Sequence, residues 1–162
     1  MITKRKRIKE IFAGDIYVFK DNNLVISTLL GSCVAVCLLD SNNSIYGMNH
    51  FMLPTKSYSR SNNNRAKYGV DAIALLLERM IHLGANSKNL KAKIFGGGQV
   101  AKIQYSNIAL ENIKLAREIL SKEKIPIIAE DVGGNYGRQI YFCAGGSVYL
   151  RKIKNILPKI LY

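Results

Sequence analysis

The sequence predicts an α+β domain, a layered α/β sandwich in which mixed or antiparallel sheets pack with two long helices. Three observations predict it. Short runs rich in Val, Ile and Leu recur along the chain, two longer segments carry apolar residues at helical spacing, and turns rich in glycine or asparagine separate neighbouring runs. The chain has 162 residues, so we expect one domain over residues 1–162 with a substantial core. The basic segment 1–13 and the tail 153–162 are expected to be peripheral.

The N-terminal half predicts four strands, each a short run of mainly apolar residues. They are residues 16–20, 24–30, 34–39 and 45–53. Gly31-Ser32 separates the second run from the third. A run of turn formers, residues 40–44, separates the third from the fourth, which we expect to return antiparallel to it.

Two longer segments predict helices, because their apolar residues lie three and four apart. The first is residues 65–83, with Gly84 placed to end it. The second is residues 108–122, and Pro126 beyond it cannot continue a helix. The segments around the second helix predict further strands, at residues 90–95, 125–130, 139–143 and 147–152. The glycines between the last two favour a hairpin.

Cys33 and His50 form the candidate catalytic pair. A thiol with a pKa near 8.5 is mostly protonated at neutral pH, and an adjacent imidazole can make it a nucleophile. If Asp40 pairs with Ile45 across the turn, Cys33 faces Met52, and His50 lies two residues along on the same face. Such diagonal neighbours are about 7–8 Å apart. A tighter loop would place Cys33 directly opposite His50, whereas a shift of one residue would put them on opposite faces.

A structural role for the cysteines is the main alternative, because free cysteine is among the most buried residue types. Cys37 and Cys143 lie inside apolar runs and fit that interpretation. Cys33 differs because it follows Gly31-Ser32 at a strand edge, where a thiol can be exposed and main-chain N–H groups can bind an oxyanion. The Cys33 and Cys37 spacing has no second Cys or His pair, so we expect no metal site and no cofactor.

Other sequence features favour structural roles. The run Gly96-Gly97-Gly98 lacks the Lys-Ser/Thr of a phosphate loop, so we expect it to allow tight turning or close approach. Glu130 and Asp131 are adjacent and predict surface positions, and His82 suits the C-terminal end of a helix.

The chain is strongly basic, with 24 Lys and Arg against 11 Asp and Glu, a net charge of +13. This charge could serve an acidic partner or could form a solvated basic surface. We favour the second, because the basic residues are spread along the chain without a nucleic-acid-binding motif, and we expect no nucleic-acid partner. The odd number of cysteines and the absence of a signal sequence or a spanning apolar run favour a cytoplasmic protein.

Two segments together resemble the signature of the CheD family, the chemoreceptor glutamine deamidases. They are Leu-Gly-Ser-Cys-Val-Ala-Val-Cys-Leu at residues 30–38 and Gly-Met-Asn-His-Phe-Met-Leu-Pro at residues 47–54. The likeness continues at residues 67–69, 83–85, 92–98 and 129–134, so that it covers about residues 14–152. Near the second helix, where the family has Gly-x-Arg-Asn, only Asn112 is kept.

The resemblance implies hydrolysis of selected glutamine side chains on methyl-accepting chemoreceptors, at the cytoplasmic receptor array and without a cofactor. It also implies a fold similar to the catalytic domains of deamidating toxins, and a CheC-type phosphatase as a further partner. By position Cys33 is the nucleophile and His50 the base. The family's third catalytic residue is a threonine six before the cysteine, where this chain has Ser27, and we expect Ser27 to orient His50 by a hydrogen bond. If the strand runs straight, Ser27 shares a face with Cys33 and Thr28 points away. A non-catalytic module that regulates receptors or the phosphatase is the alternative function.

Overall fold

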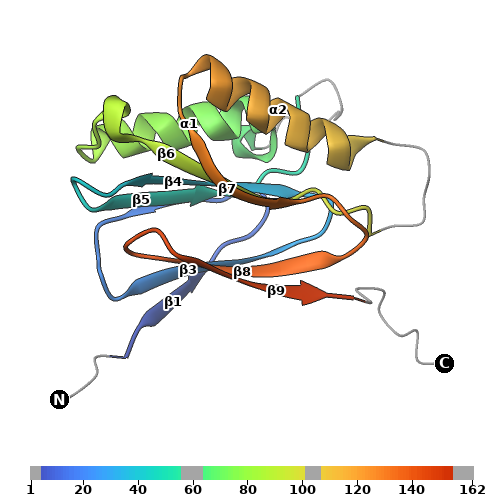
Figure 1. Ribbon diagram of the computed structural model, residues 1–162, viewed down its shortest axis with the longest axis horizontal. Coiled ribbons are helices and arrows are strands. Elements are labelled where there is room, and N and C mark those ends of the chain that lie inside the picture. The colour runs from blue at the N-terminus through green and yellow to red at the C-terminus, as the bar shows by residue number, and fades with distance from the viewer. Residues whose placement is uncertain (1–4, 56–63, 101–106, 155–162) are drawn as a thin grey trace.

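The computed structural model describes residues 5–55, 64–100 and 107–154. Two helices pack on one face of a five-stranded sheet, and a four-stranded sheet packs on its other face (Figure 1). This arrangement confirms the predicted layered α+β fold. No helix in the described ranges is long and apolar enough to cross a membrane.

The five-stranded sheet has the order β2-β5-β4-β6-β7, and the four-stranded sheet has the order β1-β3-β8-β9. Each contains one parallel pair, β6 with β7 and β1 with β3, so both are mixed. The strands are β1 (Arg7–Glu10), β2 (Ile16–Phe19), β3 (Leu24–Leu30), β4 (Val34–Asp40), β5 (Ile45–Asn49), β6 (Lys91–Gly96), β7 (Ile127–Val132), β8 (Gly137–Cys143) and β9 (Val148–Ile153). The helices are α1 (Gly69–His82) and α2 (Ile108–Lys122), with short 3₁₀ turns at η2 (Arg65–Lys67) and η3 (Ser87–Asn89).

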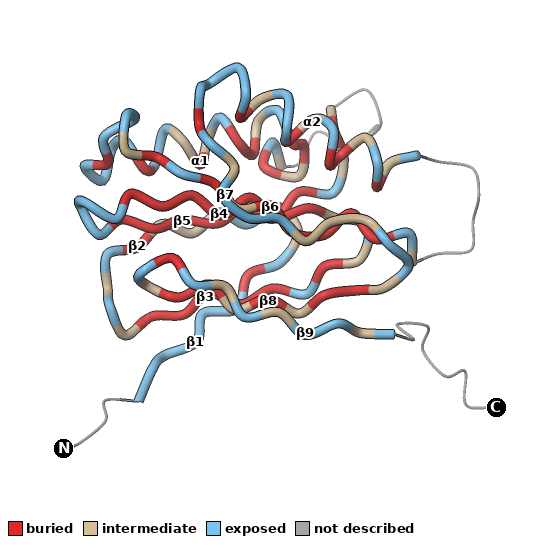
Figure 2. Tube along the Cα trace, viewed as in Figure 1, coloured by how far each residue is buried: buried red, intermediate tan, exposed pale blue. Residues whose placement is uncertain are grey.

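Strand β4 lies in the middle layer, and all of its residues are buried (Figure 2). Alternate side chains face opposite layers. Val34, Val36 and Leu38 pack with the helices, while Cys37 and Leu39 pack between the two sheets. Burial on both faces explains why the sequence here is a continuous apolar run rather than an alternating one.

Most predicted elements are confirmed, and α2 has the predicted bounds. Helix α1 begins at Gly69 rather than at residue 65, because residues 65–67 form a 3₁₀ turn. Strand β5 ends at Asn49, four residues before the predicted end. There the side-chain oxygen of Asn49 accepts the N–H of Val36 at 2.8 Å, a bond that a regular ladder would give to a main-chain carbonyl.

Part of the segment 1–13, which is expected to be peripheral, belongs to the four-stranded sheet as an exposed edge strand. Strand β1 pairs in parallel with β3, from Arg7 opposite Leu24 to Glu10 opposite Ser27. Ile11, which follows it, is only 2% exposed. The charges of a strand at a sheet edge stay in water and discourage pairing with other chains. The composition of such a strand therefore resembles that of a solvated tail. Residues 155–162 of the C-terminal tail lie outside the described residues.

Asp40 closes the β4–β5 turn, and its replacement by alanine should destabilise the fold by about 3 kcal/mol. The buried carboxylate accepts hydrogen bonds from the main chain and side chain of Asn43 and from the N–H of Asn86 at 2.8 Å. Burial would raise the pKa of Asp40, but these hydrogen bonds prevail and lower it. The carboxylate therefore stabilises the fold at neutral pH, and this contribution is lost as pH falls through the lowered pKa.

Urea unfolding at pH 7 and at acidic pH measures this effect. The exposed residue Ser41, in the same turn, supplies the control variant Ser41→Ala. Equal stability of Asp40→Ala and Ser41→Ala at pH 7 would contradict the assignment.

Candidate active site

The segment Gly31–Cys33 carries the chain from β3 in one sheet to β4 in the other. The run Gly96-Gly97-Gly98, at the end of β6, holds this segment through two main-chain hydrogen bonds. The N–H of Gly97 donates to the carbonyl of Cys33 at 2.8 Å, and the N–H of Gly98 donates to that of Gly31 at 2.9 Å. Gly96 has φ +110°, and a Cβ there would overlap the carbonyl oxygen of Cys33. The glycine run therefore permits close approach to the cysteine segment, as expected.

His50 is held by its main chain directly after β5. Its N–H donates to the carbonyl of Asp15 at 3.2 Å, and its carbonyl accepts from the N–H of Gly14 at 2.8 Å. Both partners belong to the β1–β2 turn. His50 therefore extends the pairing of β5 with the β2 side beyond Asn49, while Phe51 pairs again with Val34 of β4, so the His50 backbone is fixed.

The β4–β5 register brings Cys33 and His50 to the same end of the sheet. Asp40 pairs with Ile45, and Val34 bridges Phe51. Extended by one residue, this register places Cys33 opposite Met52, with His50 diagonal to it. Of the two registers that would place Cys33 and His50 on one face, this is the one with the longer turn. It makes the two residues diagonal neighbours, which lie about 7–8 Å apart.

Both side chains belong to the space between the two sheets. Cys33 packs at the edge of the core cluster that fills this space, together with Cys37 of β4. The Nδ1 atom of His50 lies 2.7 Å from Oγ1 of Thr28, which belongs to β3 in the opposite sheet. The candidate site therefore spans the two sheets at one end of the sandwich.

Thr28, not Ser27, contacts His50, so the prediction that Ser27 bonds to the imidazole is wrong. Ile26, Thr28 and Leu30 occupy the inner face of β3, and Ser27 occupies the outer face, where Oγ accepts from the side-chain amide of Gln139. Counting from Ser27 to Cys33 failed because β3 ends at Leu30 and the chain then changes sheets. The sequence of β3, Leu-Val-Ile-Ser-Thr-Leu-Leu, does not alternate between apolar and polar residues, so it gives no local signal that Thr28 faces inward.

The hydrogen bonds of Thr28 determine the tautomer of His50. The Thr28 hydroxyl has a single proton, and the carbonyl oxygen of Ile11, 2.7 Å from Oγ1, can only accept. Thr28 therefore donates to Ile11 and accepts from Nδ1–H of His50. This assignment leaves Nε2 of the neutral ring with a free lone pair, as a general base requires.

Burial keeps both members of the pair uncharged at neutral pH. It lowers the pKa of His50 to about 4, although the negative charge of Asp15 partly opposes this shift. Burial also raises the pKa of Cys33 to about 11, opposed in part by the cysteine's own N–H. The resting site is a neutral thiol with a neutral imidazole, so the thiol proton must leave as the sulfur attacks.

The remaining candidates have structural positions. Cys37 and Cys143 are buried and free of disulfides. His82 is the last residue of α1, and Glu130 pairs with Arg117 of α2 at 2.7 Å. Within the described ranges, no cluster of three or more His, Cys, Asp or Glu side chains could hold a metal ion.

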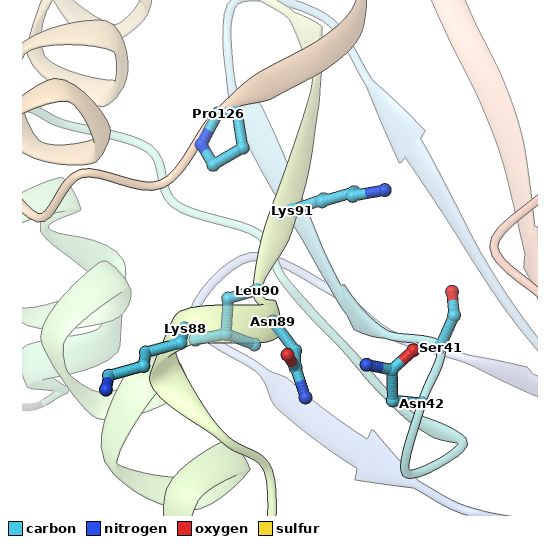
Figure 3. A pocket seen from close by; sticks show the side chains of 7 residues that line it. All are labelled: Ser41, Asn42, Lys88, Asn89, Leu90, Lys91 and Pro126. Atoms are coloured by element: carbon cyan, nitrogen blue, oxygen red, sulfur yellow. The ribbon is translucent and has the colours of Figure 1, made fainter.

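A polar pocket of about 210 Å³ lies beyond the opposite end of β4 from Cys33 (Figure 3). Asparagine, serine and lysine side chains form much of its lining, including Asn42, Lys88 and Lys91. Its lining contains no cysteine, histidine or carboxylate, so this pocket lacks the thiol and the imidazole of the candidate site.

Comparison with known proteins gives a consistent set of relatives. A family model described as "CheD chemotactic sensory transduction" matches residues 52–152. The "Probable chemoreceptor glutamine deamidase CheD" of Laribacter hongkongensis is 41% identical over 150 residues, covering 90% of this chain and 73% of the relative. The protein of Shewanella oneidensis named "Probable chemoreceptor glutamine deamidase CheD 1" is 41% identical over 157 residues, covering 94% and 75%. Among solved structures, the Bacillus licheniformis hypothetical protein YfiH matches with 16% identity and a TM-score of 0.49, covering 79% of this chain and 60% of that one.

Proposed function

Since this chain belongs to the CheD family, we propose that it is a chemoreceptor glutamine deamidase whose nucleophile is the thiol of Cys33. The observation that carries the proposal is the hydrogen-bonded pair Thr28–His50, which leaves Nε2 free on the side of the sheet that holds Cys33. Relatives named for this activity support the substrate class. A binding module that only regulates a partner would not need a buried imidazole with a fixed tautomer.

In the first half of the reaction, Sγ of Cys33 attacks the carboxamide carbon while Nε2 of His50 removes the thiol proton. The carbonyl oxygen becomes an oxyanion, which main-chain N–H groups near Ser32 and Cys33 stabilise. The imidazolium then protonates the amide nitrogen, the carbon–nitrogen bond breaks, and ammonia leaves. The product of this half is a thioester between Cys33 and the receptor.

In the second half, a water molecule attacks the thioester while His50 accepts its proton. The carbon–sulfur bond breaks, the proton returns from His50 to the sulfur, and the receptor side chain leaves as glutamic acid, which loses its proton to the solvent at neutral pH. The reaction uses no external oxidant or reductant. Each turnover adds one negative charge to the receptor, which biases its signalling state by electrostatic repulsion.

Thr28 serves as the positioning residue of this site. Replacement by valine keeps its shape but removes the acceptor for Nδ1–H, so the ring loses its fixed orientation and tautomer. We expect Thr28→Val to lower kcat about 10- to 100-fold. Ser27→Ala, one residue away on the outer face, is the matched control and should retain kcat within about twofold. A larger loss for Ser27→Ala than for Thr28→Val would contradict the assignment.

The substrates proposed here are the cytoplasmic parts of methyl-accepting chemoreceptors, and the protein acts at the receptor array. A CheC-type phosphatase is the second proposed partner, supported by the family membership alone. Complex formation with such a phosphatase, measured by isothermal titration calorimetry, tests this part separately from catalysis.

Ammonia release from purified receptor cytoplasmic fragments tests the proposed function. The wild-type protein should release ammonia continuously, at a rate proportional to its concentration. Binding to the fragments without ammonia release would instead favour the regulatory-module alternative.

A further inference from the structure

Asn112 of α2 connects the two chain segments that form the candidate site. Its side chain is fully buried. The Nδ2 group donates to the carbonyl of Met52 at 2.9 Å and to the carbonyl of Ser32 at 3.3 Å. Because the register places Cys33 opposite Met52, this single amide bridges the cysteine segment and the segment that follows His50.

The contact with Ser32 determines how the adjoining peptide group is oriented. The carbonyl of Ser32 and the N–H of Cys33 belong to one planar peptide and point in opposite directions. Asn112 belongs to the helix layer, so its bond to the carbonyl directs the Cys33 N–H away from α2, toward the side of the sheet where the thiol lies. Burial raises the pKa of the Cys33 thiol, and this N–H partly opposes the rise. No main-chain carbonyl within the described residues accepts this N–H.

The two hydrogen bonds donated by Asn112 satisfy only half of its buried amide group. Its Oδ1 atom is buried and has no hydrogen-bond partner within the described part of the chain. An unpaired buried acceptor is unfavourable because it has lost its hydrogen bonds to water, and this cost offsets much of what the two donated bonds contribute. The other buried residues of α2 are apolar. An amide among them that carries the cost of an unpaired acceptor points to a role in the reaction.

We propose that Asn112 is a positioning residue for the oxyanion. It holds the Ser32–Cys33 peptide so that the Cys33 N–H points at the oxygen that becomes negative when the thiol attacks. By donating to the carbonyl of the same peptide, it also polarises that N–H and makes it a stronger donor. The role on receptor glutamine rests on the proposed function, whereas the oxyanion role applies to any carbonyl that Cys33 attacks.

Two small reagents separate this role from a general structural one. p-Nitrophenyl acetate acylates a thiol through a tetrahedral oxyanion and releases p-nitrophenol, whereas iodoacetamide alkylates the same thiol by displacing iodide and forms no oxyanion. Asn112→Leu should slow acylation about tenfold and leave alkylation within about twofold of wild type. Asn107→Leu is the matched control, because Asn107 is an exposed asparagine at the start of α2 whose side chain makes no capping bond. Rates are corrected with Cys33→Ala.

An equal fall in both rates, or an unchanged acylation rate, would overturn the proposal. If Asn112→Leu does not fold, the same acylation and alkylation rates are compared in Asn112→Ala, because water can enter the space that the shorter side chain leaves. On receptor fragments the leucine variant should lower kcat with little change in KM. The two proposals can also fail separately. If the wild type releases no ammonia from receptors but Asn112→Leu selectively loses ester acylation, the proposed function is contradicted and the oxyanion role is supported.

Discussion

Cys33→Ala is expected to abolish ammonia release from receptor fragments, with a rate loss on the order of 10⁴-fold or more. The reaction requires a nucleophile that forms the thioester, and the other two cysteines cannot replace it. Cys37 is fully buried in the core between the sheets, and burial raises its pKa far above the usual range. Cys143 is buried at the end of β8. A coupled assay for ammonia measures the loss.

Cys37→Ala is the matched control for this variant. It removes a thiol from the same strand layer and leaves a small cavity, so it should cost stability but retain the catalytic rate of the folded fraction. Activity that survives in Cys33→Ala, or that disappears in folded Cys37→Ala, would show that the nucleophile has been assigned to the wrong cysteine.

His50→Ala should slow the reaction about 10³-fold at neutral pH and change the shape of its pH profile. With a pKa of about 11, only about one Cys33 in 10⁴ is a thiolate at pH 7. Wild-type His50, with a pKa of about 4, is neutral and able to accept the proton from about pH 5 upward. The wild-type rate should therefore be nearly flat from pH 6 to 9. In His50→Ala the rate should follow the thiolate and rise about tenfold per pH unit.

The comparison variant is His82→Ala, which removes the other histidine from the exposed end of α1. It should reproduce the flat wild-type profile. A flat profile in His50→Ala as well would mean that another group accepts the thiol proton.

Much of the fold could be predicted because the local signals agree with one another. The spacing of apolar residues and Pro126 defined α2 to the residue. The turn formers after β4 predicted that β5 returns antiparallel, and the observed pairing of Asp40 with Ile45 is one of the registers that they left open. The family was also identified from the sequence, and the comparisons confirm it. These features depend on short stretches of chain, which sequence patterns describe well.

The third residue of the site could not be predicted by counting along the chain. The side-chain alternation of a strand holds only within one sheet, and the chain changes sheets between Leu30 and Val34. Strand β1 was missed because its charges resemble those of a solvated segment. The position of Asn112 depends on how α2 packs over the ends of two strands, which is a tertiary contact without a local signal.

The intact mass of a receptor cytoplasmic fragment, followed by peptide sequencing, tests the central claim most directly. Incubation with the wild-type protein should add about one dalton for each modified glutamine. The added mass should be located on glutamine side chains and should be absent after incubation with Cys33→Ala. An unchanged receptor mass, or an equal gain with wild type and Cys33→Ala, would contradict the assignment of this protein as a Cys33-dependent glutamine deamidase.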